Sequence, residues 1–121
     1  MRTIDFVALE GQTLLNISGA VAGSEEIIFE AKDDKNYQMN HRQDCCERVV
    51  VEEVIGDVSD LIGSPILLAE EVVSKDELGR NTYESQTWTF YKLSTIKGSV
   101  TIRWLGESNG YYSESVDFVE F

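Results

Sequence analysis

The chain's single histidine and its two cysteines lie within one short stretch, HRQDCCERV, residues 41–49. Thiolates and an imidazole are ligands that zinc favours, so His41, Asp44, Cys45 and Cys46 could in principle hold a metal. The spacing argues against this, because structural zinc sites usually separate paired cysteines by two residues or more and add a second ligand pair. The sequence has no second pair, so we expect no metal.

The same stretch could supply a Cys–His pair for nucleophilic catalysis. Such a pair needs a base within hydrogen-bond reach of the thiol and usually a third, orienting group. His41 and Cys45 could meet across a turn, oriented by Gln43 or Asp44, but sequence neighbours at a strand end rarely project into one pocket. We favour a turn held by the Gln43 and Asp44 side chains, with one cysteine packed inward. Adjacent cysteines also fit ordinary disulfide geometry poorly, so we expect reduced thiols.

Other catalytic arrangements are weak. Paired carboxylates occur at several places, but among 22 acidic residues such pairs arise by chance and are typical of solvated faces. No strand–glycine loop–helix unit is present to hold a phosphate, and His41 has no nucleophile-elbow serine. The sequence therefore predicts a protein that is not an enzyme and that uses no cofactor.

Arg103 is the charged residue that stands out, because it interrupts the apolar run SVTIRWLG, residues 99–106. Strand alternation puts Arg103 and Thr101 on one face, and Ile102 and Trp104 on the other. A salt bridge to one of the many acids is the default interpretation of this arginine. The alternative is that its planar fork binds a phosphate or a carboxylate.

Aromatic side chains near Arg103 in the sequence could stack against a flat base. The tandem tyrosines after Asn109-Gly110 are expected to send their rings to opposite faces of a strand. With these rings the arginine forms a candidate nucleotide site. The candidate ligand-binding residues are Trp88, Phe90, Thr101, Arg103, Asn109, Tyr111 and Tyr112.

The elements that must position these residues are mostly strands. The 121 residues suggest one domain, residues 1–121, of the α+β class: a mainly antiparallel β-sheet with one short helix, in a single compact domain. A helix is expected at GDVSDLIG, residues 56–63, capped by Asp57 or Ser59. Turns are expected at AKDDKN, TIKG and Asn109-Gly110, the last as a tight hairpin, and KDELGRNTYES reads as a loop. The expected strands cover residues 13–19, 25–31, 35–41, 48–54, 65–74, 86–94, 99–106 and 115–121.

The charge balance limits the classes of partner that the protein can bind. With 22 acids and 10 bases the net charge is −12, which repels DNA and RNA duplexes. Two options remain: an acidic inhibitor that mimics nucleic acid and binds a basic host protein, or a protein whose few bases gather at one anion-binding pocket. No apolar run is long enough to span a membrane and the start lacks a signal peptide, so we expect a cytoplasmic protein without a membrane partner.

Two long stretches resemble the first type of phage Thoeris anti-defence proteins, small proteins of phages and prophages. They are HRQDCCERVVVEEVIGDVSDLIGSPILLAEEV and TWTFYKLSTIKGSVTIRWLGESNGYYSESVDFVEF, and the similarity runs from about GQTLLNISG to the end of the chain. The distinctive blocks are QDCCE, residues 43–47, and TIRW…SNGYYSE, residues 101–104 and 108–114.

The resemblance implies a signal sponge in the cytoplasm of an infected bacterial host. Such a protein binds cyclic ADP-ribose isomers made by TIR-domain proteins without cleaving them, so the Thoeris effector stays off. The resemblance also implies a homo-oligomer, a dimer or a hexamer, with uptake of cyclic oligonucleotides at a separate site in some members. By this resemblance Arg103 corresponds to an arginine that contacts phosphate. Arg48 departs from the family pattern, in which a small polar residue is expected directly after the QDCCE block. A hydrolase of the same nucleotide is the third interpretation.

Overall fold

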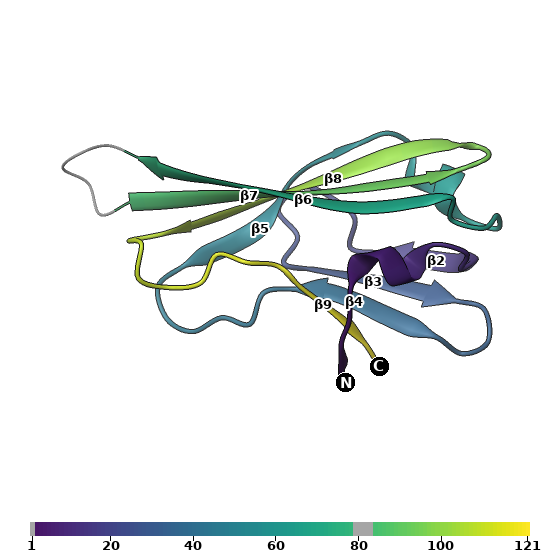
Figure 1. The fold of residues 1–121 in the computed structure, drawn as a ribbon, viewed down its shortest axis with the longest axis horizontal. Coiled ribbons are helices and arrows are strands. Elements are labelled where there is room, and N and C mark those ends of the chain that lie inside the picture. The colour runs from purple at the N-terminus through teal and green to yellow at the C-terminus, as the bar shows by residue number, and fades with distance from the viewer. Residues whose placement is uncertain (1, 79–83) are drawn as a thin grey trace.

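Nine β-strands and two 3-10 turns make up the part of the chain that the computed structural model describes, residues 2–78 and 84–121 (Figure 1). The 3-10 turns are η1 (Phe6–Leu9) and η2 (Val58–Leu61). Within these residues no helix is long and apolar enough to cross a membrane. The strands are β1 (Arg2–Thr3), β2 (Leu14–Ser18), β3 (Glu26–Ala31), β4 (Asn36–Asn40), β5 (Arg48–Ile55), β6 (Leu68–Leu78), β7 (Glu84–Thr95), β8 (Gly98–Ser108) and β9 (Asp117–Glu120).

The strands form two antiparallel sheets that face each other (Figure 1). The first sheet has the order β1-β9-β4-β3-β2, and the second has the order β5-β8-β7-β6. Strands β6, β7 and β8 are the longest, and together they extend beyond the smaller first sheet in Figure 1. The second sheet therefore has one end that the first sheet does not cover.

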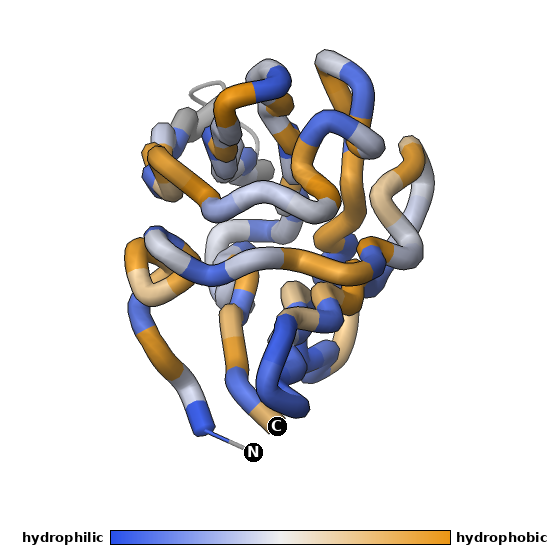
Figure 2. The backbone as a smooth tube through the Cα atoms, turned by 90° about the vertical axis from the view of Figure 1, so that its right-hand side faces the viewer, coloured by the Kyte–Doolittle hydropathy of each residue, from blue (hydrophilic) through white to orange (hydrophobic). Residues whose placement is uncertain are grey.

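The core lies between the two sheets. Buried residues alternate with more exposed ones along β3, β4 and most of β8, so each sheet turns one apolar face inward. Figure 2 shows hydrophobic and hydrophilic segments in both layers. Phe6 of η1 joins the two layers: its ring lies 4.6 Å from that of Tyr91 in the second sheet and 5.2 Å from that of Phe118 in the first. Trp104 and Tyr91 are fully buried in this core.

The predicted fold is confirmed as a mainly antiparallel β protein in one domain, with the sheet divided into two layers. The predicted short helix is the 3-10 turn η2, where the Asp57 carboxylate accepts the backbone N–H of Ser59 at 3.0 Å. The predicted turn at AKDDKN is the β3–β4 hairpin turn, with positive φ at Asp33 and Asp34. The predicted strand at residues 65–74 is confirmed from Leu68 onward, where β6 begins.

Two local predictions are wrong. Asn109-Gly110 does not join two paired strands, because β8 belongs to the second sheet and the next strand, β9, pairs with β4 and β1 in the first. The predicted loop at residues 75–85 is wrong at its two ends, which are strand: β6 continues to Leu78 and β7 begins at Glu84. Residues 79–83 of that loop lie outside the described residues.

Candidate functional site

The outward face of the second sheet carries four of the predicted ligand-binding residues. Trp88 and Phe90 on β7, and Thr101 and Arg103 on β8, are each half-buried on the face opposite the core. The guanidinium carbon of Arg103 lies 4.8 Å from the Trp88 ring centre and 5.8 Å from that of Phe90. An arginine over aromatic faces is held by attraction to the ring quadrupole. The four residues therefore form one surface, named here the arginine–aromatic surface.

Arg103 already has an acidic partner on this surface. Its Nη1 donates to Oε2 of Glu53 at 2.5 Å, and the two side chains are 29% and 50% exposed. Strand pairing explains the contact, because Arg103 lies directly opposite Glu53 on β5. This pair uses one nitrogen of the guanidinium, which carries five N–H donors in all, so an anionic ligand would compete with Glu53 for Arg103.

The arginine–aromatic surface continues toward a hollow at the uncovered end of the sheet. Residues two apart on a strand share a face, so successive cross-strand rows stack along it. Three rows run across β5, β8 and β7: Glu53–Arg103–Phe90, Val50–Leu105–Trp88 and Arg48–Glu107–Gln86. Buried Val50 and Leu105 form the apolar floor of the middle row. The last row lines the hollow, so the hollow and Arg103 belong to one face.

The hollow has a volume of about 380 Å³, within the range of small-molecule sites. It lies where β5 begins, β8 ends and β7 begins. Arg48 supplies its guanidinium, which is 3.8 Å from the Glu107 carboxylate in a largely exposed pair. Its lining residues in the described part of the chain are Cys46, Arg48, Ser85, Gln86, Glu107, Ser108 and Asn109.

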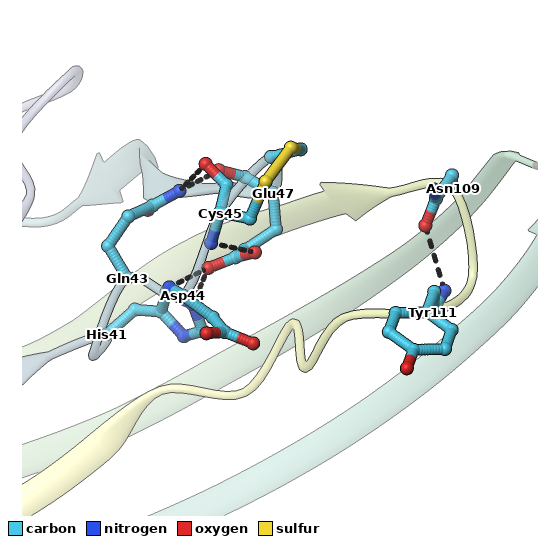
Figure 3. The surroundings of a disulfide bond; sticks show 8 residues. His41, Gln43, Asp44, Cys45, Glu47, Asn109 and Tyr111 are labelled. Atoms are coloured by element: carbon cyan, nitrogen blue, oxygen red, sulfur yellow. Dashed lines mark hydrogen bonds and ion pairs between the residues drawn. A yellow bond between two sulfur atoms is a disulfide. The ribbon is translucent and has the colours of Figure 1, made fainter.

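The stretch that holds the cysteines forms one wall of this hollow. Cys45 and Cys46 are joined by a disulfide, so the expectation of reduced thiols is contradicted (Figure 3). Both cysteines are exposed, so neither packs inward as predicted. The predicted role of Gln43 is confirmed, because its amide donates to the carbonyls of Cys45 at 3.3 Å and Glu47 at 2.5 Å. Asp44 contributes through its backbone N–H instead of its side chain.

Glu47 organises the turn from its centre. Its buried carboxylate accepts the N–H groups of Asp44 at 2.5 Å and Cys45 at 3.3 Å, and it lies 3.1 Å from Nε2 of His41 (Figure 3). The hydrogen bond from the Asp44 N–H lowers the pKa of Glu47 most. Burial raises this pKa, but the hydrogen bonds from His41 and Cys45 lower it further, so the pKa is about 2. Glu47 was missed from the sequence, because nothing local distinguishes it from the other acids.

The remaining predicted residues lie in the turn after β8. The Asn109 side chain accepts the N–H of Tyr111 at 3.0 Å, which closes the turn beside the hollow (Figure 3). Tyr111 is 83% exposed, and its ring lies 5.1 Å from the Tyr112 ring in an edge-to-face pair. The expectation of opposite faces is wrong, because these residues form a turn and not a strand.

The structure thus divides the predicted set into two groups. Trp88, Phe90, Thr101 and Arg103 form the arginine–aromatic surface, while Asn109 lines the hollow with Tyr111 and Tyr112 following it in the turn. The other hollow residues escaped prediction, because they meet through the β5–β8 pairing, which joins segments about fifty residues apart. Alternation along β5 and β8 could have indicated their face, but not their register.

Other chemistry has less support in the described residues. In residues 2–78 and 84–121, no group of three or more His, Cys, Asp or Glu side chains could hold a metal ion. His41 is engaged by Glu47 and by the Ser115 carbonyl, and the cysteine sulfurs are bonded to each other. Neither is available as a nucleophile–base pair in this arrangement.

Comparison with known proteins gives a family without an assigned activity. A family model described as a domain of unknown function, DUF7448, matches residues 3–118. No curated protein matches the chain, and no solved structure does. The chemistry of the site must therefore be argued from its own residues.

Proposed function

The chain belongs to the DUF7448 family, and we propose that this member binds and sequesters a cyclic ADP-ribose-type signalling nucleotide without cleaving it. By this proposal the protein acts in the cytoplasm of an infected bacterial host. It lowers the free signal made by TIR-domain proteins, so that the Thoeris effector is not activated. The proposal includes a homo-oligomer, either a dimer or a hexamer, and uptake of cyclic oligonucleotides at a separate site.

One observation carries the proposal: the two blocks that mark the resemblance meet at the hollow. Cys46 belongs to QDCCE, and Ser108 and Asn109 belong to SNGYYSE, yet all three line the same cavity. These blocks lie about sixty residues apart in the sequence and in different elements. A ligand site explains why both would be distinctive, since each contributes a wall.

The chemistry of the surrounding face suits a nucleotide. Trp88 and Phe90 offer stacked rings 6.3 Å apart, on which a flat base can lie. Arg103 and Arg48 lie on the same face, two rows apart, and can each donate to phosphate oxygens. Binding without cleavage needs only such contacts, because sequestration requires affinity and no reacting group.

Calorimetric titration of the purified protein with cyclic ADP-ribose isomers tests this directly. We expect tight binding of at least one isomer, and chromatography after heat denaturation should recover the nucleotide intact. Recovery of a linear product would instead indicate a hydrolase. Absence of binding to every isomer would overturn the proposal and favour an acidic inhibitor of a basic host protein.

A matched pair of arginine variants locates the site. Arg103→Ala should weaken binding at least tenfold, since it removes both a charged donor and a stacking partner. Arg2 is the control, because it also pairs with one glutamate, Glu120 at 2.9 Å, but lies on the first sheet away from the aromatic rings. Equal affinity of the Arg103→Ala and Arg2→Ala variants would exclude the arginine–aromatic surface.

A further inference from the structure

Three of the four border strands of the two sheets are short or partly covered. On β5, the carbonyl of Val51 accepts the N–H of Gly23 at 2.7 Å, and the Val51 N–H donates to the carbonyl of Ser24 at 2.8 Å. On β2, the carbonyl of Leu14 accepts the N–H of Gly63 at 2.9 Å. The border strand β1 is only two residues long. Short or covered edges protect a sheet against pairing with another chain.

The fourth border strand, β6, reaches the uncovered end of the second sheet and is covered only at its start (Figure 1). There the Ala69 N–H donates to Oε2 of Glu10 at 3.1 Å, so it points away from β7. Backbone groups alternate between the two edges of a strand, and β6 pairs with β7 without a register shift. The N–H and C=O groups of Glu71, Val73 and Lys75 therefore point outward too, and in the described part of the chain no other segment bonds to them.

Apolar side chains are exposed along this open edge. Val73 lies opposite Thr89 on the face that turns toward the core, and it is 57% exposed. Val72 lies opposite Phe90 on the outward face, and it is 37% exposed. The edge thus combines free backbone groups with exposed valines on both faces, which is the combination that a strand from a second chain covers.

The charges on the open edge fit a second copy of the same chain. Glu71 and Lys75 lie two residues to either side of Val73 and share its face. In antiparallel pairing about a two-fold axis at Val73, Glu71 lies opposite Lys75 of the partner subunit, and Lys75 lies opposite the partner's Glu71. Moving the axis one residue toward the start of β6 would set Lys75 against the partner's Ala69, whose N–H is already bonded to Glu10. Moving it one residue the other way would set Val73 against the partner's Lys75.

We propose that two copies of this chain form a homodimer by antiparallel pairing of β6 with β6 of the partner subunit about Val73. The proposal rests on the proposed function only in taking the protein as a homo-oligomer, and it names the interface. A two-fold axis perpendicular to the sheet keeps both arginine–aromatic surfaces on one face of a continuous sheet. The row of Arg103 and Phe90 continues through Val72 to Ser74 of the partner subunit, so each copy extends the other's ligand surface.

Cysteine cross-linking of the full chain tests the register. The Cα atoms of two residues that exchange hydrogen bonds across antiparallel strands lie about 5.5 Å apart, within disulfide reach. Val73→Cys should therefore give a covalent dimer on mild oxidation, seen on a non-reducing gel. Val72→Cys is the matched control, because residue 72 lies opposite the partner's Ser74 and about 7–8 Å from residue 72 of the other copy, which is too far for a disulfide. The parent chain controls for Cys45 and Cys46.

Charge reversal tests the self-complementary pairs in solution. Glu71→Lys and Lys75→Glu each set like charges opposite one another twice in the dimer. Each should raise the dimer dissociation constant about tenfold in sedimentation equilibrium. The double variant, Glu71→Lys with Lys75→Glu, restores opposite charges at both places and keeps the net charge of the parent. Its dissociation constant should return close to that of the parent.

The results that overturn this interface differ from those that overturn the proposed function. A parent that stays monomeric at every concentration, equal cross-linking of the Val72→Cys and Val73→Cys variants, or no recovery in the double variant would each reject the β6 interface. Binding of a cyclic ADP-ribose isomer by such a protein would keep the proposed function. A dimer cross-linked through Val73→Cys that binds no isomer would keep the interface and reject the nucleotide.

Discussion

Nε2 of His41 lies 3.1 Å from Oε1 of Glu47, and the two side chains are only 5% and 0% exposed. The other ring nitrogen, Nδ1, is 2.7 Å from the carbonyl oxygen of Ser115. A carbonyl oxygen only accepts, so Nδ1 is a donor in this arrangement. The pair therefore connects the end of β4, the disulfide turn and the segment before β9, and of these the disulfide turn lines the hollow through Cys46.

This relationship predicts an acid-sensitive turn. The pKa of Glu47 is lowered from 4.5 in the unfolded chain to about 2 in the fold, chiefly by the Asp44 N–H. A lowered carboxyl pKa stabilises the fold above the unfolded value, and that stabilisation is lost as the pH falls from about 4.5 to about 2. Thermal unfolding between pH 7 and pH 2 should show this loss in the parent and a smaller one in Glu47→Gln. Identical pH profiles would contradict the prediction.

The ion pair between Arg103 and Glu53 predicts that removing the Glu53 charge raises the affinity for the ligand. If ligand phosphate competes with Glu53 for the guanidinium, Glu53→Gln should raise the affinity for the bound cyclic ADP-ribose isomer severalfold. Arg103→Lys should lower it, because an ammonium neither forks nor stacks as a guanidinium does. Glu120→Gln, which frees Arg2 on the other sheet, is the charge-matched control for calorimetry. A similar gain in Glu120→Gln would mean that net charge alone acts.

Gly106 is predicted to be required for the close approach of the Glu114 segment. A Cβ at Gly106 would lie 2.5 Å from the Glu114 carbonyl oxygen and 2.7 Å from its Cβ. Backbone cannot give way easily, so Gly106→Ala should lower the free energy of unfolding by about 1–3 kcal/mol in urea denaturation. At Gly98 the nearest atom, 2.6 Å away, is the side-chain oxygen of Asp60, which can move. Gly98→Ala should therefore cost less, and an equal cost would refute the argument.

The β3–β4 turn offers a stabilising substitution. Asp33 and Asp34 have φ of 66° and 57°, a region that disfavours residues with a Cβ. Asp34→Gly should raise the free energy of unfolding by about 0.5–1 kcal/mol. Asp34→Asn removes the same charge but keeps the Cβ, so urea denaturation should show a smaller gain for it. Equal gains would assign the effect to charge.

The sequence by itself determined the local structure of this protein. Period-two alternation predicts the buried faces of β4 and β8, because side chains in a strand point to opposite sides. Asp57 predicts the start of η2, and the tandem aspartates predict the β3–β4 turn, because each rests on contacts within a few residues. The placement of Trp88, Phe90, Thr101 and Arg103 on one face follows from the same alternation across one hairpin.

Only the tertiary structure decided which distant strands meet. The pairing of β5 with β8 and of β9 with β4 and β1 depends on how two apolar faces pack, and no local pattern encodes it. The same packing sends the chain that follows Asn109-Gly110 across to the other sheet, brings Cys46 and Asn109 to one hollow and buries Glu114 against Ser85. The hollow is therefore a product of long-range pairing, because its walls come from three segments that lie far apart in the sequence.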